Sequence, residues 1–358
     1  MAYDLKIING QVYDGDGGEP FAANVAVSDG VIVEVGPCKG SATTVIDAAG
    51  AIVTPGFIDL HTHYDGQVSW DETLSPSINH GVTTVVMGSC GVGFAPVRES
   101  DRDTLVRIME GVEDIPGAAL AEGITWDWES LPQYMDSLDA KPHSIDFAVQ
   151  VTHDPLRVYV MGERAVYNES ASAEDIAEMQ RLTREALEAG AVGFSTGRSD
   201  VHRSADGQWT PSSEASAEEL AGIAAAMDGL GHGVLQAVND FNLEREGDQF
   251  PVEFDILEQF AKAANGRPFS LSLMQRDFAP DQWQRIIARA EDLSEDGLNI
   301  RLQVAPRGIG VTVGLQCTFH PFIGFPSYKK ICHLPLAERV AAMRAPAFRA
   351  QLLTEESE

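Results

Sequence analysis

Basic residues, cysteines and long apolar runs are all scarce in this chain of 358 residues. Only 25 lysines and arginines face 54 acidic residues, which gives a formal net charge of −29 at pH 7. Such a charge disfavours binding to nucleic acid or to anionic membrane surfaces. The four cysteines, Cys38, Cys90, Cys317 and Cys332, are too dispersed to indicate a disulfide framework. No apolar run reaches the roughly 20 residues that a transmembrane helix needs.

The overall composition favours a folded chain with a sizeable core. Hydrophobic residues make up 44 % of the sequence and charged residues 22 %. At about 150 residues per domain, the length indicates one large domain or two smaller ones. The N-terminus contains Asp4 within a strand-like alternation, which is unlike a secretory signal peptide. We therefore expect a cytoplasmic protein.

Short strand patterns fill residues 1–50. The dipeptide Asn9-Gly10 separates two apolar runs and predicts a β-hairpin. A second hairpin is predicted at residues 28–30, between strands at 24–27 and 31–35, and residues 44–46 form a further strand. The pattern predicts a small N-terminal β-sandwich subdomain of antiparallel strands over residues 1–50.

From residue 51 onward, buried β-runs alternate with helical patterns. Strand-like runs occur at residues 57–60, 82–87, 147–151, 191–194, 234–238, 269–273 and 300–304. Strands that alternate with helices predict an α/β fold with a parallel sheet. We expect a TIM-like (β/α) barrel over residues 51–358, incomplete in that seven of its eight strands are recognised.

Three helices and one long insertion are predicted between these strands. Helical periodicity marks residues 172–189, 216–230 and 280–293. Ser172 is the expected N-cap of the first of these helices, and residues 216–219 form a predicted capping box in the second. Residues 91–142 are long and acidic, and we interpret them as a loop with helices that borders the substrate pocket.

Two histidines give the most specific functional signal. His61 and His63 follow an apolar run, and side chains two residues apart on a strand point to the same face. At the C-terminal end of a barrel strand such a pair can bind one metal ion, and imidazole suits zinc, copper, iron or nickel. The alternative is two ordinary polar residues at a junction between a strand and a loop.

The surrounding motif resembles a known family. Residues 54–63, Thr-Pro-Gly-Phe-Ile-Asp-Leu-His-Thr-His, resemble the signature of the amidohydrolase superfamily, and the strands before them resemble its β-sandwich. Residues 81–93 resemble the second strand of N-acyl-D-amino-acid deacylases, the D-aminoacylases, in which the cysteine at the position of Cys90 binds metal. The alternative for Cys90 is a small buried free cysteine. Residues 151–157 and 190–197 resemble further strand segments, with Thr152 where the family has glycine.

The second half of the chain departs from this family pattern. Strands five and six of D-aminoacylases each end in a metal-binding histidine, whereas residues 234–240 and 270–275 contain no histidine. Gln236 or Ala237 stands at the first of these positions. No strand leading to the family's catalytic aspartate follows residue 306. The chain resembles a member that lacks its C-terminal part, and we expect a fragment, a homo-oligomer or a second chain that covers the open barrel edge.

The resemblance implies a metal-dependent hydrolase of linear amide bonds. His61, His63 and Cys90 supply three protein ligands, the number typical of a catalytic zinc site. We expect one zinc ion, with another divalent metal as the alternative. Asp65 and Asp240 are candidates for the missing general base, although aspartates in loops are commonly solvated turn residues.

Further candidates lie where barrel strands end. His153 is a candidate for orienting the substrate or an oxyanion, with a core histidine as the alternative. The expected substrate is a small N-acyl amino acid, whose carboxylate suits a bidentate arginine contact. Candidates for substrate binding are Arg157, Arg198, His202, Asn239 and Gln275. For the arginines, the alternative is a loop held by local salt bridges.

Two other functions remain open. A homologue with an incomplete site would act as a binding protein or depend on a partner, and the missing histidines favour that interpretation. A cyclic amide hydrolase of the dihydropyrimidinase type is a weaker interpretation. Those enzymes use a carboxylated lysine on strand four, and residues 193–197 contain no lysine.

Overall fold

The computed structural model describes residues 2–241, 247–276, 279–306, 308, 312–317 and 320–357. Two compact units are present, Met1–Ile58 with Ser77–Thr84 and Asp59–Pro76 with Val85–Glu358. Within the described ranges, none of the helices has the length and apolar character needed to traverse a bilayer.

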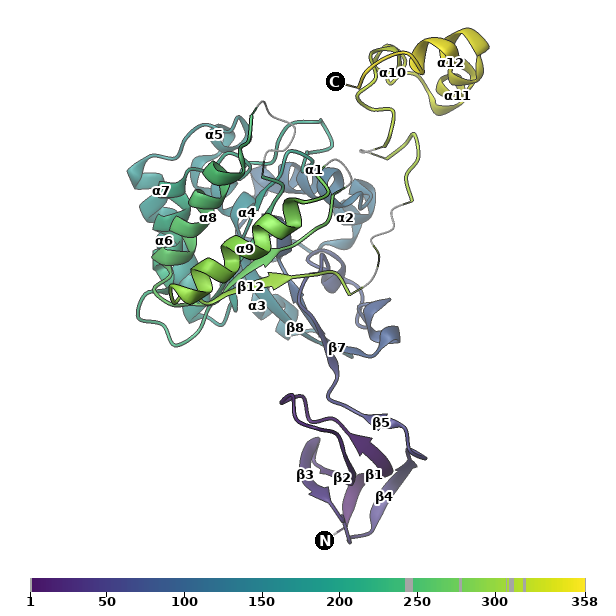
Figure 1. The fold of residues 1–358 in the computed structure, drawn as a ribbon, viewed down its shortest axis with the longest axis vertical. Helices are drawn as coiled ribbons and strands as arrows, with labels where there is room; N and C mark the ends of the chain where they lie inside the picture. Colours follow the sequence, from purple (N-terminus) through teal and green to yellow (C-terminus); the bar gives the residue numbers. More distant parts are fainter. Residues whose placement is uncertain are drawn as a thin grey trace. The chain divides into compact units, whose positions relative to one another are not determined.

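The first unit contains a mixed sheet of five strands, drawn in purple in Figure 1. Its strands are β1 (Tyr3–Val12), β2 (Phe21–Ser28), β3 (Val31–Gly36), β4 (Ala42–Asp47) and β5 (Ile52–Val53). The hairpin predicted at residues 28–30 is confirmed, because β2 and β3 pair antiparallel. β1 and β2 also pair antiparallel. The expectation that all the strands are antiparallel is wrong, since β4 and β5 both pair parallel to β1.

The hairpin predicted at Asn9-Gly10 is wrong, because β1 runs straight through these residues. Asn9 has a φ of 57°, and the register between β1 and β2 shifts between Ile7 and Gly10. The left-handed residue therefore makes a β-bulge inside one strand instead of a turn between two strands.

A second sheet contains seven strands in the order β12-β11-β10-β9-β8-β7-β6. Its strands are β6 (Phe57–Asp59), β7 (Val82–Met87), β8 (Asp146–Thr152), β9 (Gly193–Arg198), β10 (Val234–Asn239), β11 (Phe269–Ser272) and β12 (Ile300–Gln303). The neighbouring pairs from β8 to β12 are parallel. Each of the seven strands overlaps a predicted run, although β9 begins two residues later and ends four residues later than predicted, and the α/β fold with a barrel-type sheet is confirmed.

This sheet is curled, since residues at the C-terminal ends of its two edge strands contact each other. His61 comes two residues after β6, and its side chain hydrogen-bonds to that of Gln303, the last residue of β12. The backbone N–H of Gly91, beyond β7, donates to Ser195 Oγ in β9. The C-terminal ends of the strands therefore converge, as they do at the mouth of a (β/α) barrel.

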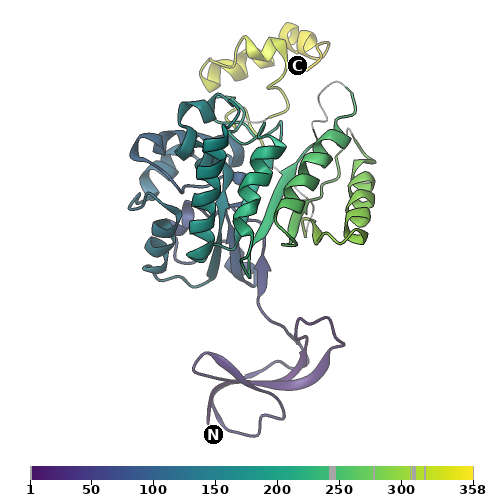
Figure 2. The ribbon, with the colours of Figure 1, turned by 90° about the vertical axis from the view of Figure 1, so that its left-hand side faces the viewer.

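Helices cover the outer side of the curled sheet (Figures 1 and 2). They are α4 (His153–Met161), α5 (Glu163–Val166), α6 (Ala173–Glu188), α7 (Ala217–Ala224), α8 (Phe250–Ala263) and α9 (Gln282–Glu295). Ser172 caps α6 as predicted, and its side chain accepts from Asp175 N. The core between sheet and helices is aromatic: the Phe260 ring of α8 contacts Phe194 of β9 and Phe269 of β11.

The segment between β7 and β8 contains three α-helices, α1 (Arg102–Glu113), α2 (Gly117–Gly123) and α3 (Leu131–Asp139). Trp128 Nε1 donates to the backbone oxygen of Phe94, and the Tyr134 hydroxyl donates to that of Asp65 over 2.7 Å. The Tyr134 bond holds the segment against the loop that carries His63, and the Trp128 bond joins two parts of the segment itself.

Short helical turns and C-terminal helices complete the described chain. The turns are η1 (Gln67–Ser69), η2 (Ser77–His80), η3 (Ser89–Gly91), η4 (Glu99–Asp101) and η5 (Ala225–Met227). Near the C-terminus lie α10 (Pro326–Lys329), α11 (Leu336–Arg344) and α12 (Pro346–Leu352). Ser327 and Glu355 bond side chain to side chain within this segment, which ties α10 to the end of the chain.

Candidate metal centre

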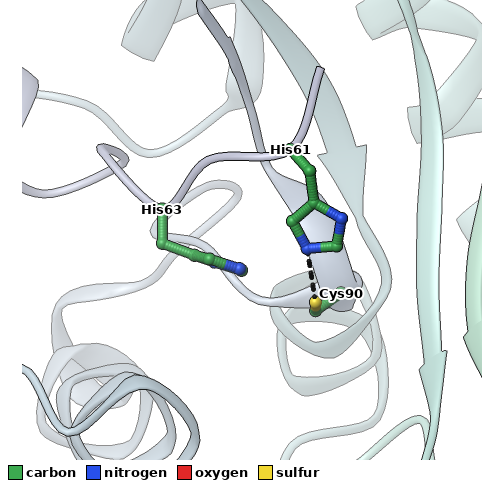
Figure 3. A group of neighbouring side chains, drawn as sticks. All are labelled: His61, His63 and Cys90. Atoms are coloured by element: carbon green, nitrogen blue, oxygen red, sulfur yellow. Dashed lines mark hydrogen bonds between the residues drawn. The ribbon is translucent and has the colours of Figure 1, made fainter. Parts of the chain in front are cut away.

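The three predicted metal ligands come together beyond the ends of β6 and β7 (Figure 3). His61 Nε2 lies 3.1 Å from Cys90 Sγ. One potential ligand atom from each of His61, His63 and Cys90 lies within 4.8 Å of the other two. The two imidazole rings are 5.4 Å apart between centroids and inclined by 62°. Two nitrogens and one sulfur are therefore grouped closely enough to bind a single cation after small side-chain movements.

An unusual turn directs the Cys90 thiol towards the histidines. Gly88, Cys90 and Gly91 have φ values of 80°, 59° and 80°. The left-handed conformation costs a residue with a Cβ roughly 1 kcal/mol or more. Close packing fixes the turn, because a Cβ on Gly197 of β9 would lie only 2.4 Å from the Cys90 backbone oxygen. The glycines around Cys90 therefore allow the backbone turn that points the Cys90 side chain towards His61 and His63.

Neighbouring side chains determine which ring nitrogens are available. His61 Nδ1 lies 2.9 Å from Gln303 Oε1, so Nδ1–H donates and Nε2 keeps a lone pair that faces Cys90. His63 Nε2 lies 3.2 Å from Oε1 of Glu113, the last residue of α1. His63 Nδ1 is buried and has no hydrogen-bond partner within the described ranges. Neither Gln303 nor Glu113 lies in a sequence motif that predicts a place at this centre.

The electrostatics of the group fit a cation. Burial, together with the charge of His61, lowers the pKa of His63 to about 3, so its ring is neutral at pH 7. Burial likewise lowers the pKa of His202 to about 4, and its Nδ1 is buried without a hydrogen-bond partner in the described part of the chain. Burial, followed by the charge of Glu113, raises the pKa of the Cys90 thiol. Neutral imidazoles with an orphaned ring nitrogen, beside a thiol that a metal would deprotonate, suit a divalent ion such as zinc.

Residues 44–358 match the model of the amidohydrolase family. The chain belongs to this family. A D-aminoacylase of Alcaligenes xylosoxydans xylosoxydans is 33 % identical over 196 residues, which cover 54 % of this chain and 38 % of that protein. An N-acyl-D-glutamate deacylase of the same organism is 29 % identical over 311 residues, which cover 85 % of this chain and 57 % of that protein.

Solved structures of the same family are similar in fold. A D-aminoacylase crystal structure has a TM-score of 0.68 and 28 % identity, covering 85 % of this chain and 59 % of its own. An N-acyl-D-glutamate deacylase from Bordetella bronchiseptica, complexed with zinc and a phosphonate inhibitor, has a TM-score of 0.64 and 27 % identity, covering 86 % and 59 %. These matches confirm the resemblance to D-aminoacylases. This family member spans between 38 and 59 % of the length of these relatives.

The two aspartates considered as general base have different surroundings. Asp65 is buried, and its burial raises the pKa to about 8. Its Oδ2 has no hydrogen-bond partner among the described residues, and its charge also raises the pKa of Cys90. Asp240 Oδ2 instead accepts the backbone N–H of Asp200 over 2.5 Å. The structure therefore brings Asp65 to the centre, whereas Asp240 holds the loop that follows β9.

His153 and Arg157 lie in a buried network. His153 Nε2 is 2.9 Å from Glu219 Oε1, and Nδ1 is 2.8 Å from Thr196 Oγ1. Arg157 Nε lies 3.1 Å from the same Glu219 oxygen. With both ring nitrogens engaged, His153 has the contacts of a core histidine. Glu219 also modifies the predicted capping box, because its N–H donates to Ser216 Oγ while its carboxylate faces this network.

The remaining substrate-binding candidates separate in the same way. Arg198 makes two hydrogen bonds with the carboxylate of Glu253, of 2.9 and 3.0 Å. Asn239 Nδ2 donates to Glu253 as well, over 3.1 Å, and Gln275 is exposed. Arg198 therefore forms a local salt bridge, as the alternative interpretation expected. Among these candidates, the structure brings only His202 to the metal centre.

Proposed function

We propose that this chain binds one divalent metal ion, preferentially zinc, through His61, His63 and Cys90, and that it hydrolyses the amide bond of N-acyl amino acids. The convergence of two neutral imidazoles and a buried thiol carries the proposal. Zinc in a related N-acyl-D-glutamate deacylase, and a binuclear metal centre in D-aminoacylase, support the choice of metal chemistry.

When bound, the ion would supply Lewis-acid polarisation of the acyl carbonyl and activation of water. The chain's own residues would orient and assist. Gln303 fixes the tautomer of His61, and Gln236 Oε1 accepts the Cys90 N–H over 3.3 Å. Gln236 Nε2 is buried without a partner among the described residues, so it is the proposed hydrogen-bond donor to the acyl oxygen. Asp65 Oδ2, also buried, is the proposed proton carrier.

The carboxylate of an N-acyl amino acid requires a cationic or hydrogen-bonding partner. Arg157 and Arg198 already bind buried carboxylates, which leaves them unsuited to the substrate. His202 lies beside His61 and His63, and its Nδ1 is buried without a hydrogen-bond partner among the described residues. We therefore assign hydrogen bonding to the substrate carboxylate to His202.

Metal analysis by mass spectrometry of the wild type, Cys90→Ala and Cys38→Ala tests the centre. Cys38 is a matched control, since it is also buried and free. About one zinc per wild-type chain, lost in Cys90→Ala and retained in Cys38→Ala, would support the proposal. Release of free amino acid from N-acetyl-D-glutamate, N-acetyl-D-leucine and their L-enantiomers then tests the activity.

A metal-binding protein without hydrolytic activity is the second candidate. It is favoured by the ends of β10 and β11, where residues 234–240 and 270–275 contain no histidine. Stoichiometric zinc without hydrolysis of any N-acyl amino acid would support this candidate. Folded wild-type protein that binds no metal would exclude both functions.

A further inference from the structure

The turn that contains Cys90 is enclosed by strands that are distant from it in sequence. A Cβ on Gly88 would lie 2.8 Å from the backbone oxygen of Gln150 in β8. A Cβ on Gly91 would lie 2.9 Å from the backbone nitrogen of Gly197 in β9. The residues on both sides of Cys90 therefore pack against the backbone of the next two strands of the sheet.

One buried hydroxyl bonds the backbone on both sides of Cys90. Ser195 of β9 is fully buried, and its Oγ accepts the N–H of Gly91 over 3.2 Å. The same hydroxyl donates its proton to the backbone oxygen of Gly88. A serine that acts as a nucleophile donates this proton to a general base instead. The contacts of Ser195 are therefore those of a group that holds the turn, and not those of an activated nucleophile.

The Cys90 backbone is also joined to the group that we propose as donor to the acyl oxygen. Gln236 Oε1 accepts the Cys90 N–H over 3.3 Å, and Gln236 Nε2 is buried without a partner among the described residues. This bond fixes the orientation of the amide, because the oxygen of a glutamine accepts an N–H and its NH₂ group does not. A displaced turn would therefore move the thiol and the Gln236 amide together.

We propose that Ser195 is a positioning residue of the metal centre, which holds the Cys90 thiol in place before a metal ion binds and orients Gln236 through the same turn. The inference rests on the proposed function, because it requires Cys90 to be a metal ligand. A ligand that is already in place loses less conformational freedom on binding. Alanine at position 195 would leave the Gly91 N–H and the Gly88 oxygen buried without this partner, which favours another conformation of the turn.

Hydrogen exchange of the metal-free wild type tests the preformed turn and needs no variant. We expect the Gly91 amide to exchange at least about a hundredfold more slowly than an unprotected amide, because Ser195 Oγ accepts its N–H without metal. Exchange of this amide at the unprotected rate, with protection only after metal is added, would overturn the inference.

Cobalt(II) titration of the wild type, Ser195→Ala and Ser213→Ala tests the effect on the centre. The d–d absorption of cobalt reports coordination, and its thiolate charge-transfer absorption reports Cys90. Ser213 is a matched control, since it is a buried serine whose hydroxyl bonds to that of Thr210 over 2.9 Å. We expect Ser195→Ala to bind cobalt about 10–100-fold more weakly, with a weakened charge-transfer band, and Ser213→Ala to match the wild type.

The outcomes separate this inference from the proposed function. Equal cobalt affinity and equal charge-transfer spectra of Ser195→Ala and the wild type would overturn the role of Ser195 and leave the centre of His61, His63 and Cys90 in place. An equal loss of affinity in both variants would also overturn it, because the effect would then belong to any buried hydroxyl. Absence of cobalt binding by the wild type would overturn the proposed function as well.

Discussion

Replacing Glu219 by glutamine should destabilise the fold without weakening metal binding. Glu219 Oε1 lies 2.9 Å from His153 Nε2 and 3.1 Å from Arg157 Nε, and all three side chains are at most 1 % exposed. Burial lowers the pKa of His153, so the carboxylate is the counter-charge of Arg157. Although burial opposes its ionisation, the hydrogen bond with His153 and the charges of His153 and Arg157 hold the pKa of Glu219 below its usual value.

The magnitude follows from the geometry of the pair. At an effective dielectric constant of about 20, two unit charges 3.1 Å apart attract by roughly 5 kcal/mol. Glutamine has nearly the same volume and can still accept the His153 N–H. Its amide is neutral, so one fewer charge is buried, and both effects reduce the expected loss of stability. Removal of one partner from a buried pair typically costs about 3–5 kcal/mol. We therefore expect the free energy of unfolding to fall by about 3 kcal/mol.

Urea unfolding followed by circular dichroism measures this change, and Glu218→Gln is the matched control. Glu218 lies in the same first turn of α7 but is exposed, so its substitution should change stability by less than about 0.5 kcal/mol. Metal stoichiometry of folded Glu219→Gln should equal that of the wild type. Equal stability of the two variants, or a stable Glu219→Gln that has lost its metal, would refute the assignment of His153 and Arg157 to the core.

Two further substitutions test the turn at Cys90 and a buried acid. Gly197→Ala should weaken metal binding, measured in competition with a chelator, because the new Cβ would lie 2.4 Å from the Cys90 backbone oxygen. Gly231→Ala is the control, since its Cβ would meet no atom within 4 Å. Equal metal affinities of the two variants would contradict this role of Gly197. Burial raises the pKa of Asp154 to about 7, above its unfolded value, so folding binds a proton and stability falls as pH rises through about 7. Asp154→Asn should lose about 2 kcal/mol less than the wild type between pH 5 and 8 in urea unfolding, and equal losses would show that Asp154 ionises normally.

The barrel strands could be predicted because a fully buried parallel strand has a local sequence pattern. β9 and β10 carry that pattern, and nearly all of their residues are buried. The β-branched run of β7 was predictable as a strand for the same reason, although β7 is only partly buried. Sequence patterns fail where the same backbone conformation occurs in two different structures. A left-handed Asn followed by Gly is typical of a hairpin turn, yet the same dihedral angles at Asn9 create a bulge within β1. Only the pairing of β1 with β2 distinguishes the two.

The residues of the metal centre also differ in whether the local sequence predicts them. His61, His63 and Cys90 were predictable, since spacing on a strand and glycines around a cysteine are local features. Gln303 lies 242 residues from His61, and Glu113 ends a helix whose own periodicity says nothing of the centre. Their roles arise from the curl of the sheet and the packing of the inserted helices, which the sequence expresses only through tertiary contacts.

The arginines show why residue type alone misleads. Arg198 ends β9 and Arg157 lies in α4, directly after β8. Substrate-binding residues commonly lie at such strand ends, and the chemistry of arginine suits a carboxylate. The carboxylates that they bind belong to Glu219 of α7 and Glu253 of α8, each buried. A buried guanidinium needs such a counter-charge from the fold itself, and helical residues tens of positions away provide it.

The origin of the ligands also bears on the number of metal ions. His61, His63 and Cys90 come from the neighbouring strands β6 and β7, so this group forms whatever the ends of β10 and β11 contain. A second ion would need donors at those ends, where Gln236 presents an amide whose oxygen already accepts the Cys90 N–H. Amide groups are weaker ligands for zinc than imidazole or thiolate. With no histidine at either of these strand ends, the described residues favour the single ion that we propose over two ions.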